Sequence, residues 1–109
     1  MPKSTIHRSR AYRMFVAEQE CFSCRLVGWT QAAHENAGKG MALKVCDSRL
    51  FPLCTVHFGV AGCHEEFDLA LDGMTRPARQ AWARKLVARM QERAVEAGWR
   101  FTAEGIVAP

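Results

Sequence analysis

Five cysteines stand in this chain, and the spacing of four of them is typical of a metal site. Cys21 and Cys24 are separated by two residues, the gap at which two thiolates in one tight turn can reach the same zinc ion. A second pair is needed to close the site, and Cys54 supplies one ligand, with either His57 or Cys63 as its partner. We favour Cys63, because a thiolate directly before a helix gains from the positive end of the helix dipole. His57 is the reserve ligand.

Other uses of these cysteines stay open. Cys54 and Cys63 are also compatible with buried apolar thiols that bind nothing. A redox role for Cys21 and Cys24 would need a thioredoxin-like pattern, which the sequence lacks. Cys46 is left over, and we expect it to be a packing residue.

Three further residues have side chains suited to acid–base or metal chemistry. His34 follows a segment that reads as a strand, and its near-neutral pKa range suits proton transfer. His64 directly follows Cys63, and Asp68 stands four residues later. Side chains four residues apart share one face of a helix, so His64 and Asp68 together can chelate one divalent cation.

Length and composition restrict the class of protein. With 109 residues the chain fits one domain, and 49% hydrophobic against 24% charged residues excludes a wholly disordered protein. The net charge of +4 favours an anionic partner, and nucleic acid is the commonest partner of a small basic domain.

The sequence contains neither a membrane helix nor an export signal by the usual criteria. No run approaches the roughly 20 apolar residues that a membrane helix needs, and the N-terminus is polar and basic. An odd number of cysteines without an export signal also argues against a disulfide framework. We expect a cytoplasmic protein with no membrane partner.

Hydrophobic spacing and turn residues predict the elements that position these side chains. An apolar arc in the longest helix should dock on the rest of the domain, and it comprises Trp82, Ala83, Leu86, Val87, Met90 and Ala94. The expected elements are a helix over 8–19, a strand over 27–33, an edge strand over 50–54, a helix over 63–71, a long helix over 76–97 and an irregular tail over 99–109.

The order of the motifs resembles a known family. The motifs are Cys21-Phe-Ser-Cys24, Gln31-Ala-Ala-His34-Glu-Asn36, Gly38-Lys-Gly-Met-Ala-Leu-Lys44, Phe51-Pro-Leu-Cys54 and Gly62-Cys63-His64-Glu-Glu-Phe-Asp68. Together they resemble the HNH endonucleases, the zinc-stapled branch of the ββα-metal (His-Me finger) nucleases. Within that family the chain looks most like the small phage and prophage proteins associated with recombination.

The resemblance implies a fold and an activity. The fold would be a single α+β domain over residues 1–109, with a zinc-stapled ββα-metal core at about 8–72, an N-terminal helix and a long C-terminal helix. The activity would be hydrolysis of DNA phosphodiester bonds, with His34 as the general base and His64 and Asp68 holding a catalytic Mg²⁺ or Mn²⁺. The four cysteines would hold a structural Zn²⁺. Asp47 would orient His34 or touch the catalytic metal.

Basic residues lie in the segments that flank this site. Lys39, Lys44 and Arg49 would contact DNA phosphates, which positions the strand without reading its sequence. Asn36 would assist from the end of the strand.

One position departs from the family pattern. Many HNH nucleases carry Asp or His directly before the base as a metal ligand, whereas this chain has Ala33. The departure keeps open an alternative function, a catalytically degenerate module in which zinc builds the scaffold and basic residues hold nucleic acid. The oligomeric state is also open, since Trp82 and Trp99 could either seal the core or form a homodimer contact.

Overall fold

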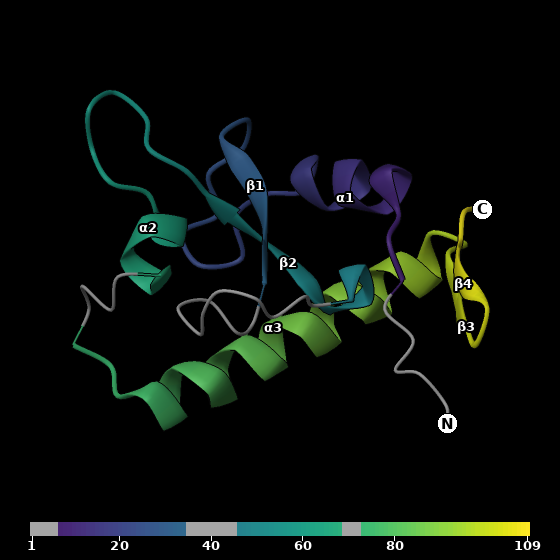
Figure 1. Cartoon of the computed structure of the whole chain (residues 1–109). Helices are drawn as coiled ribbons and strands as arrows, with labels where there is room; N and C mark the ends of the chain where they lie inside the picture. Colours follow the sequence, from purple (N-terminus) through teal and green to yellow (C-terminus); the bar gives the residue numbers. More distant parts are fainter. Residues whose placement is uncertain (1–6, 35–45, 69–72) are drawn as a thin grey trace.

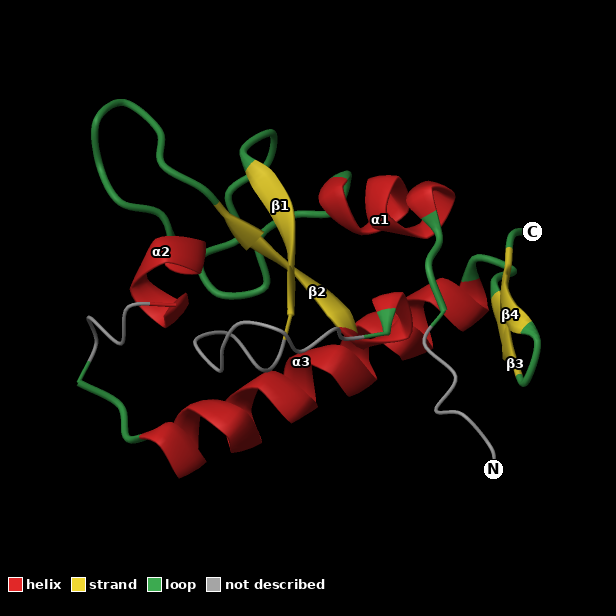
Figure 2. Ribbon diagram, viewed as in Figure 1, coloured by secondary structure: helices red, strands yellow, loops and turns green. Residues whose placement is uncertain are grey.

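The protein is a small α+β fold, described by a computed structural model over residues 7–34, 46–68 and 73–109 (Figures 1 and 2). Three α-helices surround one two-stranded antiparallel sheet, and a second two-stranded sheet closes the C-terminal end of the described chain. In chain order the elements are α1 (Arg10–Ala17), β1 (Thr30–His34), the 3₁₀ turn η1 (Asp47–Arg49), β2 (Leu50–Cys54), α2 (Cys63–Asp68), α3 (Arg76–Glu96), β3 (Arg100–Thr102) and β4 (Gly105–Val107).

The β1–β2 pair is the centre of the fold. Thr30 pairs with Cys54 at one end and His34 pairs with Leu50 at the other. Every residue of β2 is buried, because α1 and α3 both pack against this strand (Figure 1). The predicted edge strand over 50–54 is confirmed. Pro52 is tolerated because a two-stranded sheet leaves each strand one outer edge, where Pro52 still accepts a hydrogen bond from the Phe22 N–H.

The first strand is displaced from its predicted range. It runs from Thr30 to His34 instead of 27–33. Gly28 explains the late start, because its φ of +97° lies in the left-handed region, which interrupts an extended strand. His34 is therefore the last residue of the strand rather than the residue that follows it.

The helix α1 is two residues shorter at each end than its predicted range of 8–19. Ser9 has an extended backbone and its hydroxyl accepts the Tyr12 N–H, so it is the N-cap, as its position predicts. Tyr12 and Val16, four residues apart, are the buried residues of this helix and pack into the core.

The long helix α3 confirms the predicted apolar arc. Its N-cap is Thr75, whose hydroxyl accepts the Ala78 N–H, and Pro77 sits in the first turn where a missing N–H costs nothing. Trp82 is half-buried against Phe51 and Phe67, and the other five residues of the arc are buried.

The prediction of an irregular tail after Trp99 is wrong. Residues 100–107 form the β3–β4 hairpin, with Phe101 paired with Ile106. Trp99 and Phe101 place their ring centroids 5.2 and 5.3 Å from that of Tyr12, both edge-on. These aromatic contacts bury the start of the tail, which explains why it is ordered. No helix in the described ranges combines the length and the apolar character that crossing a membrane requires.

Candidate metal centre and histidine site

Four cysteines from three separate segments meet at one end of the strand pair. Cys21 and Cys24 belong to the turn that follows α1, Cys54 ends β2 and Cys63 begins α2. Their four Sγ atoms all lie within 4.8 Å of one another. We call this group the cysteine cluster. It is the set that the spacing predicts, and it could bind a metal.

The geometry of the cysteine cluster fits zinc. In a tetrahedral site with Zn–S bonds of about 2.3 Å, two sulfurs lie roughly 3.8 Å apart. The Sγ atoms of Cys24 and Cys54 are 3.7 Å apart. Cys21 Sγ accepts the N–H groups of Ser23 and Cys24 at 3.4 Å, and Cys54 Sγ accepts the Cys63 N–H at 3.3 Å. Such N–H donors stabilise the thiolate form, which is the form that ligates a metal.

The pKa values of the cysteines show how burial and neighbouring charge oppose the presence of several thiolates in one cluster. Burial raises the pKa of Cys21, but the N–H donors outweigh this effect and bring its pKa down to about 7. Burial raises the pKa of Cys63, and a negative charge on Cys21 raises it further. Burial likewise raises the pKa of Cys54. A divalent cation would remove this mutual repulsion, because it compensates the charge of several thiolates at once.

Close backbone packing brings Cys54 and Cys63 together. A Cβ added at Gly62 would overlap the backbone carbonyl groups of Cys54 and Thr55, so only glycine fits where the chain returns to β2. The Glu65 carboxylate holds this return from within α2. Its Oε1 accepts the Gly62 N–H at 2.8 Å and its Oε2 accepts the Thr55 hydroxyl at 3.0 Å.

The fourth position of the cluster belongs to Cys63, and the reserve ligand His57 lies outside it. His57 Nδ1 donates to the Thr55 carbonyl oxygen at 2.8 Å, and its ring lies 5.6 Å from that of Trp29. Cys46 is also outside the cluster. It is half-buried, as expected for a packing residue, and its Sγ accepts the His7 N–H and the Ser48 hydroxyl.

His34 and Asp47 meet at the opposite end of the strand pair. Asp47 is fully buried, and its Oδ1 lies 3.9 Å from His34 Nε2. Asp47 Oδ2 accepts the Ser9 N–H at 2.7 Å and Arg13 Nη1 at 2.8 Å, and Arg8 Nη1 lies 3.7 Å from Oδ1. We call Arg8, Ser9, Arg13, His34 and Asp47 the Asp47 cluster.

The environment of His34 keeps its imidazole neutral. Burial lowers the pKa of His34, and the Asp47 carboxylate opposes that effect without cancelling it. Positive charge on Arg8 and on His64 lowers the pKa further. Neither His34 Nε2 nor Asp47 Oδ1 has a hydrogen-bond partner in the described part of the chain. Because Nε2 is buried beside Asp47, a proton taken from water would have to enter the neutral ring at Nδ1.

His64 lies on the first turn of α2 and is tied to β1. Its Nδ1 donates to Gln31 Oε1 at 2.9 Å. A neutral imidazole with its proton on Nδ1 carries its lone pair on Nε2, so this hydrogen bond selects the tautomer of an Nε2 metal ligand. Gln31 and His34 stand three residues apart on β1, so His64 and His34 lie against opposite faces of the strand.

Part of the predicted site falls outside the described residues. Asn36, Lys39 and Lys44 belong to the range 35–45, and the side chain of Asp68 is likewise not described. Arg49 closes η1, where its N–H donates to the Cys46 carbonyl oxygen.

Sequence reasoning missed the residues that surround the two histidines. Arg8 and Arg13 pair with Asp47, and Gln31 holds His64. The sequence carried no signal that joins these residues, since Arg8 precedes the N-cap Ser9 and only Arg10 and Arg13 stand at a helical spacing. Nothing in the sequence pointed to Asp47 as their partner, because it follows Arg13 by 34 positions.

Comparison with known proteins adds no relative to this picture. The chain matches no known family, no curated protein and no solved structure.

Proposed function

We propose that this protein is a metal-dependent endonuclease of the HNH type, which hydrolyses DNA phosphodiester bonds during phage or prophage recombination or DNA processing. The observation that supports it best is the neutral, half-buried His34 beside the buried Asp47, at the end of a strand that also holds His64. The order β1, β2, α2 agrees with the strand–strand–helix order that the resemblance implies, and the cysteine cluster connects β2 to α2.

In this proposal His34 is the general base. Its neutral imidazole takes a proton from the water that attacks the scissile phosphorus. As the ring becomes charged, the Asp47 carboxylate 3.9 Å from Nε2 stabilises the imidazolium and fixes its orientation. A positioned general base contributes about 10²- to 10⁴-fold to the rate, which sets the expected loss on its removal.

His64 and Asp68 hold a divalent cation in this proposal. When bound, Mg²⁺ or Mn²⁺ supplies Lewis-acid stabilisation of the negative charge that develops on the phosphate and on the departing 3′ oxygen. The chain contributes the ligand tautomer through the hydrogen bond from His64 to Gln31. Lys39, Lys44 and Arg49 position the strand through its phosphates.

One observation favours the alternative, a nucleic-acid-binding module without catalysis. Ala33 lies on the same face of β1 as Gln31, which contacts His64. The position from which a second metal ligand would approach His64 therefore carries only a methyl group, and Ala33 is 1% exposed. A catalytic ion would then depend on few protein ligands, which Mg²⁺ tolerates by keeping its waters.

A nicking assay on supercoiled plasmid with added Mg²⁺ or Mn²⁺ separates the two functions. Three proteins are compared: the wild type, His34→Ala and His57→Ala. His57 is the matched control because it is a half-buried histidine that belongs to neither cluster. Zinc content and melting temperature are measured for each, so that loss of folding is not mistaken for loss of catalysis.

We expect the wild type and His57→Ala to nick DNA, and His34→Ala to be slower by about 10²- to 10⁴-fold while it still binds DNA. A wild type that binds DNA and cuts it with neither ion would favour the binding module. Equal cleavage by wild type and His34→Ala would remove His34 from the mechanism.

A further inference from the structure

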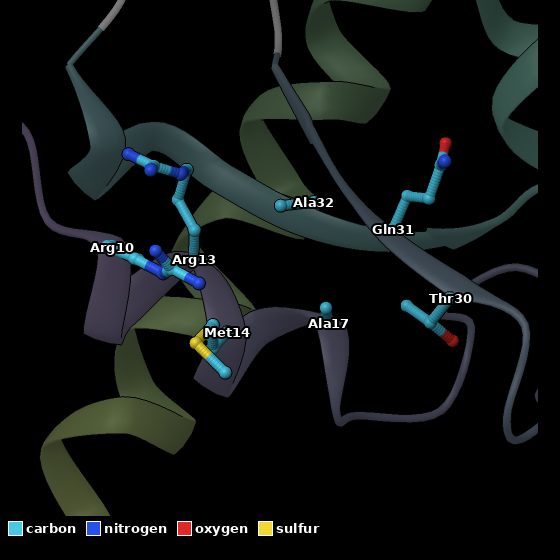
Figure 3. A pocket seen from close by; sticks show the side chains of 7 residues that line it. All are labelled: Arg10, Arg13, Met14, Ala17, Thr30, Gln31 and Ala32. Atoms are coloured by element: carbon cyan, nitrogen blue, oxygen red, sulfur yellow. The ribbon is translucent and has the colours of Figure 1, made fainter.

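A groove of about 510 Å³ lies between α1 and β1, beside the Asp47 cluster (Figure 3). Sites that hold drug-sized ligands occupy about 300–1,000 Å³, so the groove is large enough for a nucleotide unit. Four of its lining residues share one face of α1, and three belong to β1. They are Arg10, Arg13, Met14 and Ala17 on the helix, and Thr30, Gln31 and Ala32 on the strand.

The groove leads toward His34. Successive side chains of a strand point to opposite faces, so Thr30, Ala32 and His34 share one face of β1. Arg13 makes the connection at the other wall, since it lines the groove and also donates to Asp47 at 2.8 Å. A ligand that extends along the groove therefore approaches the Asp47 cluster from the Thr30 end of the strand.

The groove is positively charged, and part of that charge is uncompensated. Arg13 is balanced by Asp47, but Arg10 is exposed and makes no hydrogen bond or ion pair within the described ranges. The first turn of α1 contains no acidic residue. Asp47 therefore accounts for Arg13, whereas neither α1 nor β1 contains a carboxyl group that accounts for Arg10.

One further feature bears on the chemistry that would fill the groove. Met14 is 53% exposed although it is apolar, and it lines the same wall as Arg10. A guanidinium binds phosphate oxygens, and an apolar side chain beside it can pack against a sugar.

We propose that the α1–β1 groove binds the phosphodiester backbone of a nucleic-acid strand, with one phosphate on Arg10, and leads that strand to His34. This inference rests on the proposed function and extends it, because it assigns the N-terminal helix to substrate binding. The helix then has two tasks, since Arg13 supports Asp47 and Arg10 holds the strand.

Fluorescence anisotropy with a fluorescein-labelled oligonucleotide, without added divalent cation, tests the proposal. Single-stranded and duplex probes are titrated against the wild type, Arg10→Ala and Arg84→Ala at several salt concentrations. Arg84 is the matched control, because it is an exposed arginine on α3 that does not line the groove. Melting temperatures are recorded for all three proteins.

We expect Arg10→Ala to weaken binding about 5- to 10-fold and to reduce the slope of log K against log salt by roughly 0.7–0.9, the change for one lost phosphate contact. Arg84→Ala should bind like the wild type. Equal binding by Arg10→Ala and Arg84→Ala would overturn the proposal, as would a wild type that binds neither probe.

The outcome is distinguishable from that of the proposed function. Plasmid nicking that depends on His34, together with unchanged binding by Arg10→Ala, refutes the groove and leaves the endonuclease in place. Weakened binding by Arg10→Ala in a protein that never cuts DNA supports the groove and refutes the endonuclease.

Discussion

Removing the Asp47 carboxylate is expected to destabilise the fold strongly. Asp47 is fully buried and accepts two short hydrogen bonds, from the Ser9 N–H at 2.7 Å and from Arg13 at 2.8 Å. Hydrogen bonds to a charged group contribute about 1.5–3 kcal/mol each. The Arg13 side chain is 43% exposed, so its share belongs near the lower limit. For Asp47→Ala we expect the free energy of unfolding to fall by about 3–4 kcal/mol.

The conservative variant Asp47→Asn removes the negative charge of this side chain while it keeps the shape, so it measures how much the charge alone stabilises the fold. Its amide oxygen can still accept from Ser9 and Arg13, so the loss is only the difference between charged and neutral hydrogen bonds. That difference is about 1 kcal/mol for each bond, or about 2 kcal/mol in total. At roughly 4–6 °C per kcal/mol for a domain of this size, the melting temperature should fall by about 12–24 °C in the alanine variant and about 8–12 °C in the asparagine variant.

Urea unfolding followed by tryptophan fluorescence measures these changes. Zinc content is determined in parallel, because loss of the metal would lower stability by a separate route. Glu104→Gln is the control, since it removes an exposed carboxylate from the turn between β3 and β4. An Asp47→Asn variant within about 0.5 kcal/mol of the wild type would refute the reasoning, because changes of that size are usual for surface substitutions.

The remaining predictions concern the cysteine cluster and His34. Cys63→Ser should purify with less than one zinc per chain and a lower melting temperature. Cys46→Ser should retain the metal, because Cys46 lies outside the cluster. Elemental analysis of both variants checks this. Gly62→Ala should lower the free energy of unfolding by about 1–3 kcal/mol and weaken zinc retention, because the alanine Cβ would overlap the backbone carbonyl groups of Cys54 and Thr55. Normal zinc content and stability in this variant would contradict the prediction. Burial lowers the pKa of His34 from the ordinary 6.5, so the unfolded chain binds this proton at higher pH than the folded protein does. Stability should therefore fall as the pH drops below 6.5, and urea unfolding from pH 7.5 to 5 should show a smaller loss for His34→Ala. Cleavage should reach its plateau near neutral pH, since the base is already unprotonated there.

The cysteine cluster could be predicted from the sequence because the spacing of its cysteines along the chain reflects the geometry of the site. Two thiolates at a two-residue gap can converge only within a turn, and Cys54 and Cys63 stand at the ends of segments with recognisable strand and helix patterns. The apolar arc of α3 was predictable for a similar reason, since a helix of 21 residues repeats its pattern over several turns.

The arginine partners of Asp47 and the hairpin could not be predicted in the same way. Asp47 and Arg13 are 34 positions apart, and no periodic pattern relates residues that meet only through the packing of α1 on η1. Strands β3 and β4 have three residues each, which is too short for an alternation to stand out. The two strands are ordered because Trp99 and Phe101 contact Tyr12, and these tertiary contacts are not visible in a local sequence pattern.

The cysteine cluster and the Asp47 cluster occupy opposite ends of the strand pair, so their contributions to stability can be tested one at a time. Thr30 pairs with Cys54 at the cysteine end, and His34 pairs with Leu50 at the Asp47 end. Four residue steps along a strand cover about 13 Å, so neither cluster touches the other directly. His64 belongs to the cysteine end through its neighbour Cys63, whereas Asp47 holds His34 through α1 and η1. Removing zinc should therefore release α2 and His64 first, and it should leave the bond from Ser9 to Asp47 protected. Hydrogen exchange at the Ser9 amide before and after chelation measures this order, and simultaneous loss of both ends would mean that the fold is one cooperative unit.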